Sequence, residues 1–88
     1  MNIVYTGRFK KDFKLSIKRN RDQQKLFCVV GKLVNGQPLP AQYKDHPLSG
    51  RWIGRRDCHI EPDWILIYCI CGDDLILERT GSHSDLFC

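Results

Sequence analysis

The sequence predicts an α+β domain. An N-terminal strand and a two-helix hairpin precede a three-stranded antiparallel meander that completes one sheet, and a short C-terminal tail follows. Apolar residues recur every four positions near the N-terminus, which indicates a helix. A continuous apolar run at 64–71 leads directly into a Gly-Asp pair, which is typical of a strand and its hairpin turn. At 88 residues the chain has room for one domain with one small core, covering residues 1–88.

Two amphipathic helices are expected after a short strand at residues 3–5. In the first helix, Phe9, Phe13 and Ile17 recur among lysines, which predicts one buried stripe and a basic outer face. Asn20 is the expected N-cap of the second helix, and Gly36 follows its expected end. The apolar face of the second helix is expected to consist of Leu26, Val29, Val30 and Leu33.

Strand patterns fill the C-terminal half. Between residues 51 and 61, apolar residues favour even positions and titratable residues favour odd positions, so a strand here would gather functional groups on one face. The run at 64–71 predicts a central strand that is covered on both faces. The last strand should begin after Gly72 and end at Gly81, and the tail at 82–87 is expected to pack against the sheet.

The positive charge lies in the N-terminal half. Residues 1–44 hold ten Lys and Arg against two acidic residues, whereas residues 45–88 hold four Arg against eight acidic residues. Such a basic half is typical of a protein with a phosphate-rich partner, because Lys and Arg release condensed counterions there. A solvated helix surface is the alternative. No stretch approaches the ~20 apolar residues of a membrane span, and no signal-peptide pattern is present, so a cytoplasmic protein without a membrane partner is expected.

The cysteines indicate free thiols. Five are present, and none belongs to a Cys-x-x-Cys pair. Cys69 and Cys71 stand two apart inside the apolar run, where they are expected to pack as small hydrophobic residues. A zinc site that combines them with a histidine is the alternative, although the paired spacings of structural zinc sites are missing.

The histidines mark the expected site of chemistry. All three, His46, His59 and His83, lie in the C-terminal half within two residues of a carboxylate. An imidazole titrates near pH ~6.5, so three of them among acids and arginines favour proton transfer at neutral pH.

Three stretches carry a family resemblance. They are YKDHPLSG (43–50), GRRDCHIEPDWILIY (54–68) and ERTGSHSDLF (78–87), and they resemble the YafQ branch of the RelE/ParE superfamily of bacterial toxins. The resemblance implies one RelE-like toxin domain over residues 1–88. It also implies a ribosome-dependent endoribonuclease that cuts mRNA in the decoding site and is neutralised by a cognate antitoxin. Since the sequence has no convincing metal cluster, no cofactor or metal is expected.

Metal-free cleavage of an RNA phosphodiester needs a base for the 2′-hydroxyl, an acid for the leaving 5′-oxygen and cations for the charged phosphate. The resemblance implies that His46 is the base and His83 the acid, and these two roles could be exchanged. His59 and Asp63 would orient or charge them. Asp57 would set the tautomer or pKa of His59, two residues away on the same strand face.

The remaining site residues are expected to hold RNA. Contacts with the message are expected from Trp64, Arg79, Phe87, Lys44 and Arg55. Contacts with ribosomal RNA are expected from Lys10, Lys11, Lys14 and Lys18 on the first helix. Core packing is the alternative role for Trp64, and an ion pair is the alternative for Arg79.

Two other functions compete with the nuclease. A ParE-like topoisomerase poison or a nucleic-acid-binding member of the same fold would not need the histidines, but would need the basic helices. A small metal protein would use histidine and cysteine ligands. Substitution of the histidines distinguishes the first alternative from the nuclease, and metal analysis distinguishes the second.

Overall fold

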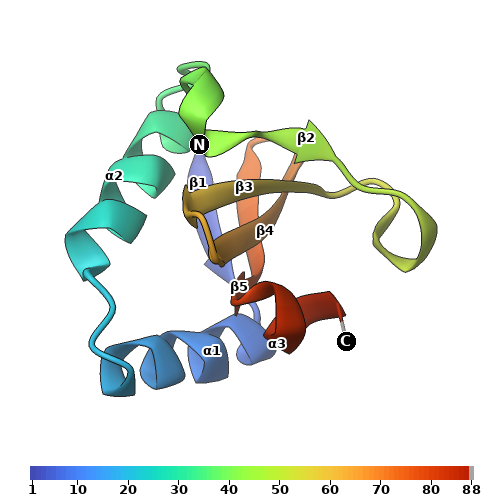
Figure 1. Cartoon of the computed structure of the whole chain (residues 1–88). Helices are drawn as coiled ribbons and strands as arrows, with labels where there is room; N and C mark the ends of the chain where they lie inside the picture. The colour runs from blue at the N-terminus through green and yellow to red at the C-terminus, as the bar shows by residue number, and fades with distance from the viewer. Residues whose placement is uncertain (88) are drawn as a thin grey trace.

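The computed structural model describes residues 1–87, which form a five-stranded mixed sheet and three α-helices (Figure 1). The strands are β1 (Asn2–Tyr5), β2 (His46–Pro47), β3 (Arg56–Glu61), β4 (Trp64–Cys71) and β5 (Asp74–Gly81). The helices are α1 (Gly7–Lys18), α2 (Gln23–Val34) and α3 (His83–Phe87), with short 3-10 turns η1 (Ala41–Tyr43) and η2 (Gly50–Trp52). The predicted α+β class and the order of the main elements are confirmed.

The sheet has the order β1-β5-β4-β3-β2. β1 runs parallel to β5, while the β3-β4-β5 meander and the edge strand β2 pair in antiparallel fashion. The sequence did not predict β2, and the strand expected from residue 51 begins only at Arg56. Residues 50–52 instead form the turn η2. Gly54 then takes a left-handed conformation with φ +88°, which is incompatible with a strand that runs through this position.

Helices α1 and α2 cover one face of the sheet. Phe9 of α1 and four residues of α2 join the inward side chains of β3, β4 and β5 in the main core. On the opposite face, a smaller cluster joins Ile65 and Ile67 of β4 to Leu86 of α3. β4 is therefore covered on both faces from Trp64 to Tyr68, as its apolar run predicts, whereas its last three residues, Cys69, Ile70 and Cys71, are half-buried or exposed. The tail expected to pack on the sheet forms α3.

Two details of the helices differ from the prediction. Ile17 is 51% exposed, and Ser16 takes the inward position instead. With 3.6 residues per turn, Ser16, seven positions after the buried Phe9, lies on nearly the same side of the helix as Phe9, whereas Ile17, eight positions after it, is rotated away from the core. Asn20 does not cap α2. It adopts φ +59° after α1, where Arg21 N donates to Ser16 O, and Asp22 caps α2 by accepting from Gln24 N.

The two helices do not lie side by side. α1 and α2 stand at a steep angle to each other in Figure 1, so the expected hairpin is an open one. Within residues 1–87, no helix is both long and apolar enough to cross a membrane.

Candidate functional site

The three histidines lie around one hollow of about 340 Å³ on the face of the sheet that carries α3. β2, β3 and α3 each supply one imidazole. The residues that line the hollow are His46, Leu48, Asp57, His59, Ile65, His83 and Phe87. The structure thus brings together side chains from positions up to 41 residues apart.

The backbone fixes the tautomer of His46. Its Nδ1 lies 2.7 Å from the carbonyl oxygen of Lys44, which can only accept a hydrogen bond. Nδ1 therefore carries the hydrogen, and Nε2 of the neutral ring keeps a lone pair. Lys44 holds its carbonyl in this place through a left-handed backbone conformation, with φ +50°.

The direct contact of Asp57 is with His46, although the predicted partner His59 also lies close enough to influence its carboxyl. Its Oδ1 lies 3.1 Å from Nδ1 of His46, because His46 and Asp57 are directly opposed in the β2-β3 ladder. The carboxylate is 3% exposed, and Oδ1 has no directed hydrogen bond among the described residues. Burial raises the pKa of Asp57, while the nearby His46, His59 and His83 oppose that shift.

His59 is fixed in the same way as His46. Its Nδ1 lies 3.1 Å from the carbonyl oxygen of Pro62, in the turn that joins β3 to β4. A carbonyl oxygen accepts, so Nδ1 again carries the hydrogen and leaves Nε2 of the neutral ring as an acceptor. His46 and His59 both line the same hollow, so two imidazoles with an acceptor at Nε2 stand beside it.

His83 opens α3, and acidic side chains secure its position. Asp63 accepts a hydrogen bond of 3.0 Å from the backbone N of His83, so Asp63 holds the backbone of the third histidine and not an imidazole. Asp85 accepts hydrogen bonds from Ser82 N and from the Arg19 guanidinium. These bonds, above all the one from Arg19, lower the pKa of the Asp85 carboxyl to about 2. The Phe87 ring packs 5.1 Å from the imidazole of His83, centroid to centroid.

Gly81 permits this close arrangement. A Cβ at this position would lie 3.0 Å from Cβ and Oδ2 of Asp85. A side chain at residue 81 would therefore need Asp85 to move by a few tenths of an ångström, so glycine suits this close approach of β5 to α3. The sequence predicted Gly81 as a strand end but not this contact.

Two expected RNA contacts have structural roles. Trp64 is fully buried in the main core, and its Nε1 donates to Thr80 Oγ1 at 2.9 Å. Arg79 donates from Nε and Nη2 to the carboxylate of Asp12 on α1, at 2.9 Å each. These hydrogen bonds raise the pKa of Arg79 and hold α1 against β5. The structure therefore replaces the expected contacts of Trp64 and Arg79 with packing and an ion pair.

The other expected contacts remain accessible. Arg55 is half-exposed and pairs with Glu78 at 3.2 Å, outside the residues that line the histidine hollow. Lys44 is exposed, and Phe87 is 36% exposed beside His83. The expected ribosome contacts Lys10, Lys11, Lys14 and Lys18 are all exposed on α1.

Asp45 is a supporting residue that the sequence did not reveal. It accepts from the Tyr68 hydroxyl at 2.7 Å and from Arg56 Nε at 3.2 Å, directly before His46. These bonds tie the segment that carries His46 to β3 and β4. Its place beside a histidine in the sequence was the available signal, but its partners lie 11 and 23 residues away.

The cysteines and histidines do not form a shared cluster in the described part of the chain. Cys58 is buried, and burial raises the pKa of its thiol. Cys69 is half-buried, whereas Cys71 is exposed rather than packed as predicted. No group of three or more His, Cys, Asp or Glu side chains within residues 1–87 is placed to hold a metal ion. Cys88 lies outside the described residues.

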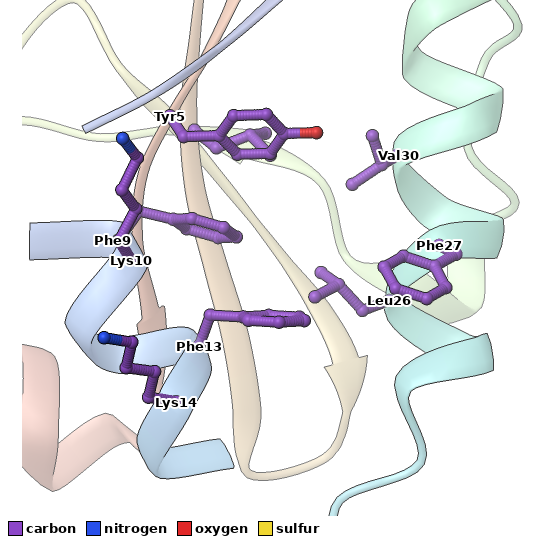
Figure 2. Close-up of a pocket in the computed structure, with 9 residues that line it drawn as sticks. Tyr5, Phe9, Lys10, Phe13, Lys14, Leu26, Phe27 and Val30 are labelled. Carbon is purple, nitrogen blue, oxygen red and sulfur yellow. The ribbon is translucent and has the colours of Figure 1, made fainter. Parts of the chain in front are cut away.

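A second feature is an apolar groove of about 410 Å³ between α1 and α2. Figure 2 shows the Tyr5, Phe9 and Phe13 rings on one side, facing Leu26, Phe27 and Val30 of α2. The ring centroids of Phe13 and Phe27 are 6.4 Å apart, and Tyr5 and Phe27 are about half-exposed. Lys10 and Lys14 complete the α1 side. The exposed rings of Tyr5 and Phe27 make this groove a candidate interaction site.

Comparisons with known proteins agree with this architecture. The sequence model of the family described as the bacterial toxin YafQ of type II toxin-antitoxin systems matches residues 1–88. The chain is 53% identical over 87 residues to the mRNA interferase toxin YafQ of Escherichia coli K12, covering 98% of this chain and 95% of the relative. The crystal structure of YafQ from E. coli BL21(DE3) matches with a TM-score of 0.95 and 51% identity, over 99% of this chain and 98% of that one.

A crystal structure of the E. coli DinJ-YafQ complex also matches, with a TM-score of 0.92 and 52% identity over 99% of this chain and 98% of that one. The fold, the site and these matches define a toxin of the type II toxin-antitoxin class. Within that class, the chain belongs to the YafQ family.

Proposed function

We propose that this protein is a ribosome-dependent endoribonuclease that cuts mRNA in the decoding site by metal-free acid-base chemistry, and that a cognate antitoxin neutralises it. The observation that carries the proposal is the set of three imidazoles around one hollow, two of which have Nε2 free as an acceptor. The mRNA interferase name of the 53% identical relative supports the same reaction class. A protein that only bound nucleic acid would not require these side chains.

His46 is the proposed general base. Its Nε2 takes the proton from the 2′-hydroxyl, whose oxygen then attacks the adjacent phosphorus and expels the 5′-oxygen of the next nucleotide. The resulting imidazolium donates through Nδ1 to Lys44 O, and the buried Asp57 carboxylate beside it compensates its charge. Asp57 is therefore proposed as the residue that positions and supports the base.

His83 is the proposed general acid. Its imidazole gives a proton to the leaving 5′-oxygen, while Asp63 and Asp85 hold the backbone of α3 in place. His59 faces the same hollow from β3, where its protonated form would compensate the charge on the phosphate. Phe87, beside His83, is placed to stack on a base, and the exposed Lys44 and half-exposed Arg55 are proposed to hold the RNA backbone.

The basic face of α1 is the proposed ribosome contact. Lys10, Lys11, Lys14 and Lys18 are exposed there, and the N-terminal half carries a large excess of positive charge. Phosphate contacts made by such residues release counterions and position the protein without reading sequence.

The groove between α1 and α2 is the proposed antitoxin contact. An amphipathic segment with an apolar face and acidic flanks would cover the exposed aromatic rings and meet Lys10 and Lys14. The solved DinJ-YafQ complex supports assembly with a cognate antitoxin. Occupation of the groove would also cover two of the lysines proposed to contact the ribosome, so the antitoxin would compete with ribosome binding.

The chemistry of the cleaved ends tests the proposed reaction. Attack by the 2′-oxygen should leave a 2′,3′-cyclic phosphate on the upstream fragment and a 5′-hydroxyl on the downstream one. The measurement uses purified protein and programmed ribosomes, with a chelator in the presence of enough magnesium to keep the ribosomes intact. A 5′-phosphate on the downstream fragment would indicate metal-activated water and contradict the mechanism. No cleavage at all would contradict the proposed activity.

Substitution of Asp57 should separate catalysis from stability. Burial raises the pKa of Asp57 in the folded state, so the folded protein binds that proton more tightly than the unfolded chain. The carboxylate therefore costs stability as pH rises through its folded pKa, and it costs nothing below its unfolded pKa of ~3.9. Asp57→Asn should raise the melting temperature by a few degrees at pH 7 while slowing cleavage by about 10–100-fold, which is less than the loss of the base itself.

The same variant provides its own pH control. The difference in melting temperature between Asp57→Asn and the unmodified protein should disappear at pH values below ~3.9, where Asp57 is protonated in both states. A variant that is both less stable at pH 7 and fully active would contradict the role given to this carboxylate.

A further inference from the structure

A second hollow of about 310 Å³ adjoins the histidine site. It is lined by Gln42, Tyr43, Lys44, His59, Ile60, Glu61 and Pro62. His59 lines both hollows, so this residue separates one from the other. Lys44 also joins them, because its carbonyl fixes the ring of His46 while the residue itself lines the second hollow. A ligand that passes from one hollow to the other would therefore cross His59.

The second hollow lies along the part of β3 that β2 leaves open. β2 pairs only with Arg56 and Asp57 in the described chain, so His59, Ile60 and Glu61 have no strand on that side. The turn η1 packs against β3 instead and supplies Gln42 and Tyr43. The walls of the second hollow are partly apolar. The wall formed by Tyr43 is held in place because this side chain packs against the main core.

The charge around this hollow suits a polyanion. The carboxylate of Glu61 is paired with Lys25 at 2.8 Å and with Arg21 at 3.4 Å, and the hydrogen bond from Lys25 lowers its pKa. The exposed Lys44 lines the same hollow, so three cations and one carboxylate lie at or beside it. A phosphate backbone that follows this path meets net positive charge.

From these observations we propose that the second hollow binds the base of the nucleotide next to the cleaved bond, and that Gln42 distinguishes one base from another. The proposal rests on the proposed nuclease function. Successive nucleotides of a single strand occupy successive sites on a protein, so a phosphate at the histidines places a neighbouring nucleotide beside His59. Tyr43, Ile60 and Pro62 provide walls for a flat aromatic base.

Gln42 is the polar group suited to reading that base. It is exposed at the hollow, and its amide offers both a donor and an acceptor. A side-chain amide can form two hydrogen bonds with the edge of one base and not with another, which makes the amide a selective contact. Gln42 would be a specificity residue, because it lies at the second hollow and not among the residues that line the histidine site.

The experiment compares cleavage rates over a set of messages that differ only in the codon presented in the decoding site of programmed ribosomes. For the unmodified protein, Gln42→Ala and the control Gln37→Ala, the quantity measured is the ratio of single-turnover rates between the best and the worst codon. Gln37 is also exposed, but it lines neither hollow. A ratio cancels any general loss of folding or ribosome binding.

We expect Gln42→Ala to reduce this ratio by about tenfold, mainly through slower cleavage of the preferred codons, whereas Gln37→Ala should leave it unchanged. If Gln42→Ala cleaves with the ratio of the unmodified protein, the proposed subsite is wrong while the nuclease function stands. Absence of cleavage by the unmodified protein would contradict both proposals.

Discussion

Replacement of His83 by alanine is expected to slow single-turnover cleavage of mRNA on programmed ribosomes by about 10²–10⁴-fold, the usual contribution of a positioned general acid. The imidazole lines the hollow with His46 and His59 and packs against Phe87. The contact that holds the start of α3 runs from the backbone N of His83 to Asp63, and an alanine keeps it. The loss should therefore appear in the rate and not in the melting temperature.

Ser84→Ala is the matched control for His83→Ala. Ser84 is the next residue of α3, is also exposed, and does not line the hollow, so this variant should cleave at the unmodified rate. His46→Ala should resemble His83→Ala. The double variant should lose less than the product of the two single losses, because residues that act as one unit are not additive. If His83→Ala cleaves at the unmodified rate, the acid is another group.

The secondary structure of this chain was largely predictable because its signals are local. The four-residue spacing of Phe9 and Phe13 and the apolar run at 64–71 each specify an element without reference to the rest of the chain. The N-cap of α2 was not predicted correctly because Asn20 and Asp22 both carry a capping side chain. Asn20 takes the left-handed position after α1, which Asn tolerates, and Asp22 is the cap.

The identities of the site residues were predictable, but several of their partners were not. Sequence spacing pairs Asp57 with His59, two residues away, whereas the sheet places His46 directly opposite Asp57. β2, which creates this contact, is two residues long and has too little sequence to show a strand pattern. A cross-strand neighbour is determined by register, which the sequence of one strand does not contain.

Long-range ion pairs were missed for a related reason. Two acidic residues that precede Arg79 in the sequence, Asp63 and Glu78, were its candidate partners. Its guanidinium instead meets Asp12, 67 residues earlier, because α1 packs on β5. Such a contact depends on which helix covers which strand. The basic and acidic halves of the chain therefore conceal specific pairs that cross between them, including Arg19 with Asp85 and Lys25 with Glu61.

A substitution in the apolar groove between α1 and α2, the proposed antitoxin contact, is expected to have the second large effect. Phe27→Asp should weaken binding of the cognate antitoxin by about 30–1,000-fold, which corresponds to ~2–4 kcal/mol for an aromatic anchor at the centre of an interface. Phe27 faces Phe13 across the groove and is 53% exposed, so its removal should cost the free toxin little stability. The new carboxylate would lose solvation against an apolar segment and would repel acidic flanks.

Calorimetric titration of the purified toxin with its antitoxin measures this affinity, and cleavage assays with added antitoxin provide the functional readout. Phe27→Asp should cleave mRNA at the unmodified rate and remain active at antitoxin concentrations that silence the unmodified toxin. Cys28→Asp is the control, because Cys28 is the next exposed residue of α2 but does not line the groove. If Phe27→Asp binds the antitoxin with an affinity within threefold of the unmodified value, the antitoxin binds another surface. Weaker antitoxin binding together with full cleavage requires that the antitoxin contacts the groove, at a distance from the histidines that carry out the reaction.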